Sequence, residues 1–250
     1  MRARLAAAIT VVFLTASCAS DRDRLSAPVA LPEVTPFSAN QAGSALPPAW
    51  QPWTLIRNPS RYELVRDGND TVVRAVARNS ASGLIHPLDI DPRAYPLLNW
   101  RWKLTDLPTV SKESPDDSPV RVVVSFEGDI SKLPFSERIF FANFRLFTGQ
   151  ELPYAALMYI WGSQSPPETI MPSPRTTRVQ MIVVERGRDG LGQWREVTRN
   201  VREDFRRAFG EEPGNIISIG IMTETDEASR DVEAFYGNIS FRRANGSSAQ

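Results

Sequence analysis

Cysteine and histidine are each limited to one residue in this 250-residue chain, Cys18 and His86. One cysteine cannot form an internal disulfide, and it excludes a metal site built from several thiolates. His86 has no second histidine to share a metal with, and the sequence holds no Gly-x-Ser-x-Gly motif for nucleophilic catalysis. We therefore expect His86, which precedes Pro87, to be a strand residue with a local hydrogen bond.

An excess of charge of either sign is also absent, because 29 basic residues face 29 acidic ones. Such a chain lacks the basic field that nucleic-acid-binding proteins use, so we expect no nucleic-acid partner. Lysine occurs only at positions 103, 112 and 132, and the other basic residues are arginines. Arginine suits bidentate recognition of carboxylate or phosphate, although a GC-rich genome produces the same bias.

Long apolar runs are missing too, since residues 5–17 fall short of the roughly 20 residues that span a bilayer. Two arginines precede this run and small residues lead from it to Cys18, which is typical of a lipoprotein signal peptide over residues 1–18. We expect lipidation of Cys18 to hold the protein on the periplasmic face of a bacterial membrane. Ala19, where an aspartate would favour the inner membrane, points to the outer membrane. The alternative is an ordinary secretory signal cut near Ala19.

The rest of the chain divides simply. Residues 19–48 are rich in Pro, Ala and Ser without hydrophobic periodicity, which predicts an extended tether. Residues 49–243 are long enough for a single domain with its own core. Residues 244–250 are polar and predict a disordered tail.

Alternation of apolar and polar residues predicts many strands in this domain. The expected strands are residues 62–66 and 71–77, joined by a turn at Asp67-Gly68-Asn69, then 84–90, 98–104, 119–126, 155–161, 177–185, 193–197, 216–222 and 234–241. Many strands and few helices predict a mainly β fold, an antiparallel jelly-roll-like β-sandwich with one or two short helices. In the order of its segments the chain also resembles galactose-binding-like sandwiches.

Two helices are expected between the strands. Ser136 is the expected N-cap of a helix that runs to Phe147. Its expected packing face consists of Ile139, Phe140, Phe144 and Phe147. Asn200 is the expected cap of a second helix over residues 201–209, which Gly210 would end in a left-handed conformation.

Several strings occur together and in order: Trp100-Arg-Trp-Lys103, Asp116-Asp-Ser-Pro-Val-Arg121, Tyr159-Ile-Trp161, Arg199-Asn-Val-Arg-Glu-Asp-Phe-Arg-Arg-Ala-Phe-Gly210 and Tyr236-Gly237. In these the chain resembles the bacterial family called domain of unknown function 3047. Its segment Thr223-Glu-Thr-Asp-Glu227 departs from the Thr-Asp-Thr-Asp-Asn pattern of that family. The family has no established activity, so the resemblance implies no catalytic residue.

Strand geometry separates the side chains of residues 100–103 onto two faces. Trp100 and Trp102 share one face, and Arg101 and Lys103 share the other. Indole rings on a sheet face can stack on sugar rings, but large aromatic residues dominate protein cores, and we favour the core. Arg101 and Lys103 would then face outward.

If the alternate valines of the next strand also face inward, Arg121 faces outward beside Arg101. Arg178 would lie close by, and Asp116 and Asp117 could be ion-pair partners of these arginines. Tyr159 and Trp161 share a face of their strand and would form an apolar floor, unless they too are core. The predicted ligand-binding set is Arg101, Asp117, Arg121, Tyr159, Trp161 and Arg178. Such a face suits hydroxyls, carboxylates or phosphates. The alternative is a mesh of weak surface ion pairs.

Carboxylates also cluster at Glu224, Asp226 and Glu227. A solvated turn is the first explanation, a calcium site near Asp226 the second. The third is a glycosidase pair of Glu224 and Asp226. We therefore predict a non-catalytic envelope module that binds a glycan or another polyhydroxylated or anionic ligand. The alternatives are a jelly-roll glycoside hydrolase and a scaffolding protein of the envelope. Apart from that calcium, no cofactor is expected.

Overall fold

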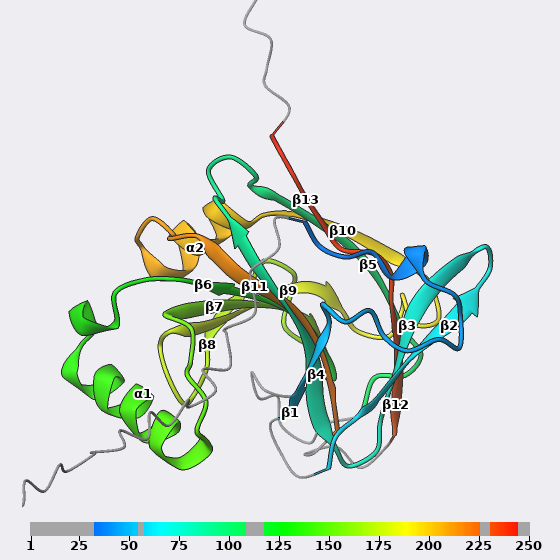
Figure 1. Ribbon diagram of the computed structural model, residues 1–250, viewed down its shortest axis with the longest axis horizontal. Helices are drawn as coiled ribbons and strands as arrows, with labels where there is room; N and C mark the ends of the chain where they lie inside the picture. The colour runs from blue at the N-terminus through cyan, green and yellow to red at the C-terminus, as the bar shows by residue number, and fades with distance from the viewer. Residues whose placement is uncertain (1–32, 55–57, 109–117, 226–230, 245–250) are drawn as a thin grey trace, which may run out of the picture.

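The computed structural model describes residues 33–54, 58–108, 118–225 and 231–244, which form two stacked β-sheets with helices at the periphery (Figure 1). Within these ranges the larger sheet has seven strands, in the order β1 (Gln51–Thr54), β4 (Ala81–Ile90), β11 (Ile216–Glu224), β6 (Val120–Phe126), β7 (Ala155–Gly162), β9 (Val179–Arg186) and β8 (Ile170–Pro172). The smaller sheet has the order β10 (Arg195–Asn200), β5 (Leu97–Leu104), β12 (Val232–Tyr236), β3 (Asp70–Ala77) and β2 (Arg61–Asp67), and β13 (Ser240–Arg242) also pairs with β5.

The chain passes repeatedly from one sheet to the other, as in jelly rolls. Among the strands that the structure describes, all pairs are antiparallel except β7 with β9, which run parallel. The short strand β8 lies between these two in sequence and pairs antiparallel with β9 at the edge of the sheet. The predicted jelly-roll-like β-sandwich with two helices is confirmed.

The core lies between the two sheets and follows the alternation of the sequence. Trp100 and Trp102 of β5 are buried, and their rings lie 5.2 Å and 6.0 Å from those of Tyr159 and Trp161 on β7. Removing a large apolar side chain from water stabilises a fold by about 1.5–3 kcal/mol. These aromatic contacts therefore hold the sheets together, and the two indoles of β5 are core residues as favoured.

The folded part begins earlier than Ala49. Phe37, in the short 3-10 helix η1 (Phe37–Ala39), is completely buried and lies 4.6 Å from the ring of Trp50. The indole N–H of Trp50 donates to the Thr35 carbonyl at 2.9 Å, and the Thr35 N–H donates to Nε2 of His86 at 3.1 Å. The predicted tether of residues 19–48 is thus too long, because an apolar residue inside it completes the core.

His86 itself is a buried strand residue of β4, as predicted. Its Nδ1 lies 2.7 Å from the Pro87 carbonyl, and since Nε2 accepts from Thr35, Nδ1 is the nitrogen that carries the proton. Burial lowers the pKa of His86, with hydrogen bonding opposing the shift. The ring is neutral at neutral pH and joins the N-terminal segment to the larger sheet.

The helix α2 (Val201–Phe209) has the predicted ends. The Asn200 side chain accepts from the Glu203 N–H at 3.2 Å, and Gly210 has φ +72° in the left-handed region. This helix covers one end of the sandwich, where the Phe205 ring lies 4.6 Å from that of Phe126.

The helix α1 (Phe135–Thr148) differs from its prediction in two respects. Its N-cap is Pro134, without a side-chain cap, rather than Ser136. Its buried residues are Glu137 and Phe141, whereas Ile139 and Phe147 of the expected packing face are exposed. The reason is a polar attachment that an apolar pattern does not reveal: the Glu137 carboxylate accepts hydrogen bonds from Thr176 and Thr177.

Candidate functional site

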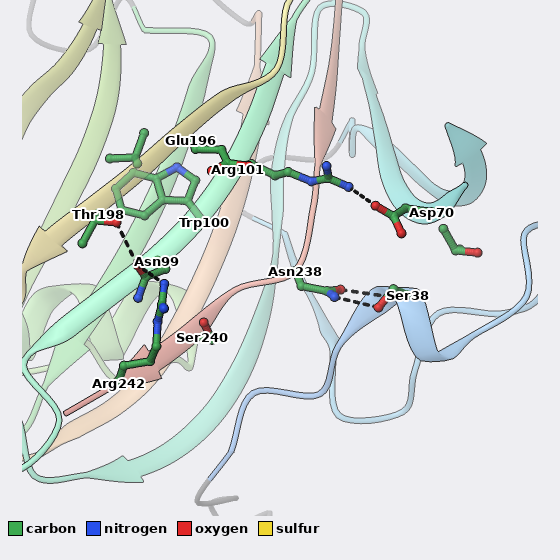
Figure 2. Close-up of a pocket in the computed structure, with 12 residues that line it drawn as sticks. Ser38, Asp70, Asn99, Trp100, Arg101, Glu196, Thr198, Asn238, Ser240 and Arg242 are labelled. Carbon is green, nitrogen blue, oxygen red and sulfur yellow. Dashed lines mark hydrogen bonds and ion pairs between the residues drawn. The ribbon is translucent and has the colours of Figure 1, made fainter. Parts of the chain in front are cut away.

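A polar hollow of about 270 Å³ opens on the outer face of the smaller sheet (Figure 2). It lies where the neighbour of β5 changes, since β12 pairs with residues 102–104 and β13 with residues 97–99. Between these two strands the Gly237 N–H still donates to the Arg101 carbonyl at 2.9 Å, but residues 238 and 239 belong to neither strand. Residues of β3, β5, β10, β13, the loop before β13 and the η1 segment line the hollow: Ser38, Asp70, Thr71, Asn99, Trp100, Arg101, Glu196, Val197, Thr198, Asn238, Ser240 and Arg242.

Cross-strand register builds one wall of the hollow. Asn99 is opposite Thr198 on one side and Ser240 on the other, so three short polar residues form a row. The Asn99 side-chain oxygen accepts from the Thr198 hydroxyl at 2.8 Å and from the Arg242 guanidinium at 2.6 Å. Its amide N–H donates a hydrogen bond to the Leu97 carbonyl at 3.3 Å. These bonds therefore fix the orientation of the Asn99 side chain.

Arg101 lies two residues further along β5, opposite Glu196. Its guanidinium donates to the Asp70 carboxylate and is centred 4.6 Å from the Trp194 ring. Gly237 allows this conformation, because a Cβ at that position would lie 2.6 Å from Cγ of Arg101. The glycine thus makes room for the arginine stem, and the side chain crosses the floor of the hollow toward β3 (Figure 2).

The N-terminal segment closes the opposite side. The Asn238 amide donates to the Ser38 hydroxyl at 2.6 Å, and the Ser38 N–H donates to the Asn238 side-chain oxygen at 3.0 Å. This reciprocal pair holds η1 against the loop between β12 and β13 (Figure 2). The hollow is therefore bounded by residues about 200 positions apart in sequence.

The chemistry of the hollow is that of hydrogen bonding. Its lining supplies hydroxyl, carboxamide, guanidinium and carboxylate groups, and it includes neither cysteine nor histidine. Two guanidiniums, Arg101 and Arg242, balance two carboxylates, Asp70 and Glu196. Such a lining suits an uncharged polyhydroxylated molecule better than a strongly anionic one.

Of the predicted ligand-binding residues, Arg101 lies in the hollow. Tyr159 and Trp161 do not form the floor of an open pocket, because both are fully buried between the sheets. The Tyr159 hydroxyl donates to Asp204 at 2.9 Å, and the Trp161 indole N–H donates to the Gly187 carbonyl at 2.9 Å. They are core residues, which was the alternative for this pair.

The expectation that Arg121 lies beside Arg101 was wrong. Outward-facing side chains of β5 and β6 lie on opposite surfaces of the sandwich, because the two strands belong to different sheets. Arg121 is also buried, with only 3% of its side chain exposed, and it forms an ion pair with Glu224. It does not contribute to an open polar face around Arg101.

Arg178 occupies a third environment, next to the C-terminal end of α2. Its Nη2 donates to Glu211 at 2.7 Å and its Nε to the Tyr154 carbonyl at 3.2 Å. The guanidinium also lies 4.2 Å and 4.7 Å from the rings of Tyr154 and Phe209. These contacts make Arg178 a connector between β9 and α2.

Asp117, Asp226 and Cys18 lie outside the described residues, so the predicted roles of these residues in ligand binding, calcium binding or catalysis, and lipidation stay predictions. Within the part of the chain that the structure describes, no group of three or more His, Cys, Asp or Glu side chains is arranged to hold a metal ion.

A partly buried network next to the core explains the string that begins at Arg199. Asp204 accepts from Tyr159 and from Arg199, and Arg199 and Arg207 both bind Glu168. The bonds from Arg199 lower the pKa of Glu168 to about 2, and Arg207 adds to the effect against the opposing influence of burial. Burial, followed by the charge of Asp204, raises the pKa of Tyr159. This network fixes α2 on the sandwich.

Sequence reasoning missed most of the hollow. Asn99 shares the outward phase of Arg101 and Lys103, so the alternation of β5 contained a signal for it. Asn238, Ser240 and Arg242 gave no such signal, because their position depends on which strand pairs with β5. The Ser38 contribution was hidden by the composition of the segment expected to be a tether.

Fold and site together define a jelly-roll-like β-sandwich with a polar hollow on the outer face of one sheet. The chain belongs to the family described as "Protein of unknown function (DUF3047)", whose model matches residues 48–240. This confirms the family resemblance seen in the sequence. No curated protein matches the chain.

Three solved structures illustrate the similarity in fold. The family 11 carbohydrate-binding module of the cellulase Lic26A-Cel5E of Clostridium thermocellum is 11% identical with a TM-score of 0.43, and the match covers 86% of this chain and 97% of that one. The xyloglucanase domain of NopAA from Sinorhizobium fredii is 10% identical with a TM-score of 0.43, covering 81% and 96%. The K1 cleaved adhesin domain of Lys-gingipain from Porphyromonas gingivalis is 10% identical with a TM-score of 0.39, and the match covers 85% of this chain and 98% of that one.

These identities and scores are too low to transfer the binding or catalytic properties of those proteins to this chain.

Proposed function

We propose that this protein is a non-catalytic binding module that holds a neutral, polyhydroxylated ligand, such as a segment of an envelope glycan, in the hollow around Arg101. The observation that carries the proposal is the lining: side chains with both donors and acceptors converge there with balanced charge. A volume of about 270 Å³ is just below the range of about 300–1,000 Å³ for small-molecule sites, which suits one or two sugar rings of a longer polymer.

The preformed geometry of the hollow supports this proposal. Asn99 and Asn238 are oriented by bonds to neighbouring residues, and Arg101 is held by Asp70 over Trp194. Fixed polar groups bind a ligand without first losing conformational freedom, which favours recognition.

An Arg101→Ala variant tests the proposal. We expect its affinity for the glycan that the native protein selects on an array to fall by about tenfold or more, since a hydrogen bond to a charged group contributes about 1.5–3 kcal/mol. Gly237→Ala should weaken binding as well, because the added methyl group displaces the Arg101 stem. Affinities are measured by titration calorimetry with the chain of residues 19–250.

The matched control is Arg74→Ala. Arg74 lies on β3 of the same sheet, binds Glu63 and Glu233, and is not part of the hollow. Its removal should leave glycan affinity unchanged. Equal losses in both variants, or no loss in Arg101→Ala, would contradict the proposed site. A protein that selects no glycan and instead co-purifies with envelope proteins would support the scaffolding alternative.

We further propose that the protein is a lipoprotein anchored through Cys18 on the periplasmic face of the outer membrane. The signal-like pattern of residues 1–18 supports this proposal. Metabolic labelling with a fatty acid should mark the native protein and not a Cys18→Ser variant, and membrane fractionation should place the labelled protein with the outer membrane. Labelling that is independent of Cys18 would contradict the anchor.

The hydrolase alternative has less support. Glu224 is engaged by Arg121, and its proposed partner Asp226 lies outside the described residues. Hydrolysis predicts new reducing ends that a Glu224→Gln variant fails to release. Binding without such release supports the module.

A further inference from the structure

Exposed apolar side chains gather at one end of the molecule. Among the described residues, seven large apolar side chains are exposed, and five of these lie on α1 or just before it: Ile130, Phe135, Ile139, Leu146 and Phe147. Phe135, Leu146 and Phe147 are the most exposed, at 69%, 75% and 82%. A contiguous apolar surface of this kind marks an interaction site in a folded protein.

Three of these residues, Phe135, Ile139 and Leu146, lie in one stripe along α1, and Phe147 extends the exposed apolar surface beside its end. Phe135, Ile139, Ala142 and Leu146 follow one another at intervals of four, three and four, which places them on a single face of α1. The opposite face holds Glu137, whose carboxylate binds Thr176 and Thr177. The helix is thus attached to the domain through a polar group, and its apolar stripe is turned outward.

Basic residues border the stripe. Arg138 and Arg145 are seven residues apart and lie along the same edge of α1. Glu137, the one acidic residue of α1, is turned inward, so the outward side of the helix carries the charges of these two arginines. The Arg138 guanidinium lies 5.7 Å from the Phe135 ring, and Arg145 has a carboxylate, that of Glu151, at 3.7 Å.

We propose that α1 lies flat on an anionic phospholipid bilayer, with its apolar stripe among the acyl chains and its arginines among the phosphates. An apolar face of Phe and Leu next to arginines is typical of interfacial helices. With 14 residues, α1 is about 21 Å long, shorter than the roughly 30 Å of a hydrocarbon core. In the ranges that the structure covers, no helix has the length and apolar character to cross a membrane.

The position of α1 fits this contact. The helix projects from one end of the molecule, whereas β5, β10 and β13 around the hollow lie toward the other (Figure 1). A bilayer against α1 therefore leaves the hollow accessible. The lipid contact depends on neither Cys18 acylation nor glycan binding, so it can fail or succeed separately from both proposed functions.

Vesicle co-sedimentation of the unacylated chain of residues 19–250, which retains every described residue, tests the proposal. We expect it to bind vesicles of phosphatidylglycerol and phosphatidylcholine more tightly than vesicles of phosphatidylcholine alone. A triple variant, Phe135→Ser, Leu146→Ser and Phe147→Ser, should bind the anionic vesicles at least about tenfold more weakly. A matched control, Tyr95→Ser with Ile217→Ser, removes the two exposed apolar side chains that lie elsewhere and should bind normally.

The thermal unfolding midpoint of each variant shows that the domain is intact, and light scattering reports its oligomeric state. Equal vesicle binding by the native chain and the triple variant, or no vesicle binding by the native chain, would overturn the proposal. So would a native dimer that the triple substitution converts to a monomer, because the stripe would then be covered by a second copy of the chain.

Discussion

At the scale of single residues, the same residue type serves different purposes according to its strand. Arg101 crosses the floor of an open hollow, Arg121 is buried against Glu224, and Arg178 lies over two aromatic rings. Arg101 and Arg121 occupy positions that alternation marks as facing away from the core, whereas Arg178 shares the phase of the core residue Ile182. Alternation separates the inside of a sheet from its outside, but it does not tell which sheet a strand joins.

His86 provides a test at this scale. Its pKa is lowered by burial, so the folded protein binds a proton at this ring less readily than the unfolded chain does. The stability that depends on neutral His86 is complete above the unfolded pKa of about 6.5, and it is lost as the pH falls toward the folded pKa. The free energy of unfolding, measured by urea titration at several pH values between 5 and 8, should therefore rise with pH.

A His86→Gln variant keeps a polar side chain and removes this ring from titration. Its stability should depend less on pH over the same range. Identical slopes for the native protein and the variant would show that other groups cause the dependence.

At the scale of elements, the sequence predicted where most strands and both helices lie. The hairpin of β2 and β3 and the caps of α2 follow from local signals, namely the Asp-Gly-Asn turn, Asn200 and Gly210. The orientation of α1 did not follow, because its apolar residues suggested a packing face and the attachment instead uses the Glu137 carboxylate. The short strands β8 and β13 were not predicted as separate strands, since so few residues carry no distinct periodicity.

Glu137→Ala tests the attachment of α1. Burial opposes ionisation of Glu137, but hydrogen bonds from Thr176 and Thr177 exceed this effect and lower its pKa. Removing the carboxylate leaves their donors unpaired, which costs about 1–3 kcal/mol. We expect faster amide hydrogen exchange over residues 135–148, with the central strands unchanged.

Glu151→Ala is the matched control, since Glu151 is exposed near the end of the same helix and its contact with Arg145 is 3.7 Å long. Its exchange pattern should resemble that of the native protein. If both variants loosen α1 equally, or neither does, then Glu137 is not its main attachment.

At the scale of the whole molecule, the sequence predicted a two-sheet sandwich and an aromatic core, but not the boundary of the fold or the shape of the candidate site. Among the members of the predicted ligand-binding set that the structure describes, only Arg101 lies in the hollow. The remaining lining comes from five separate segments whose juxtaposition depends on the strand order, and one sequence alone does not determine that order.

Chain length tests the revised boundary. A protein of residues 33–250 retains Phe37, whereas one of residues 49–250 lacks it and leaves a gap beside Trp50. Loss of a buried phenylalanine side chain costs about 3–5 kcal/mol, so the shorter protein should unfold at a clearly lower urea concentration. Phe37→Ala in the longer protein should reproduce most of this loss. Equal midpoints for the two lengths would contradict a structural role for the N-terminal segment.

The segment before β1 also has a mechanical consequence. A pull on the N-terminus reaches the domain at Val34, which packs against the core, and at Thr35, which is hydrogen-bonded to Trp50 and His86. It reaches Phe37 in the core next. Through these contacts part of the force passes to β4, in the interior of the larger sheet, before the edge strand β1 separates from the sheet. The domain should therefore resist unfolding when force is applied at its N-terminal end.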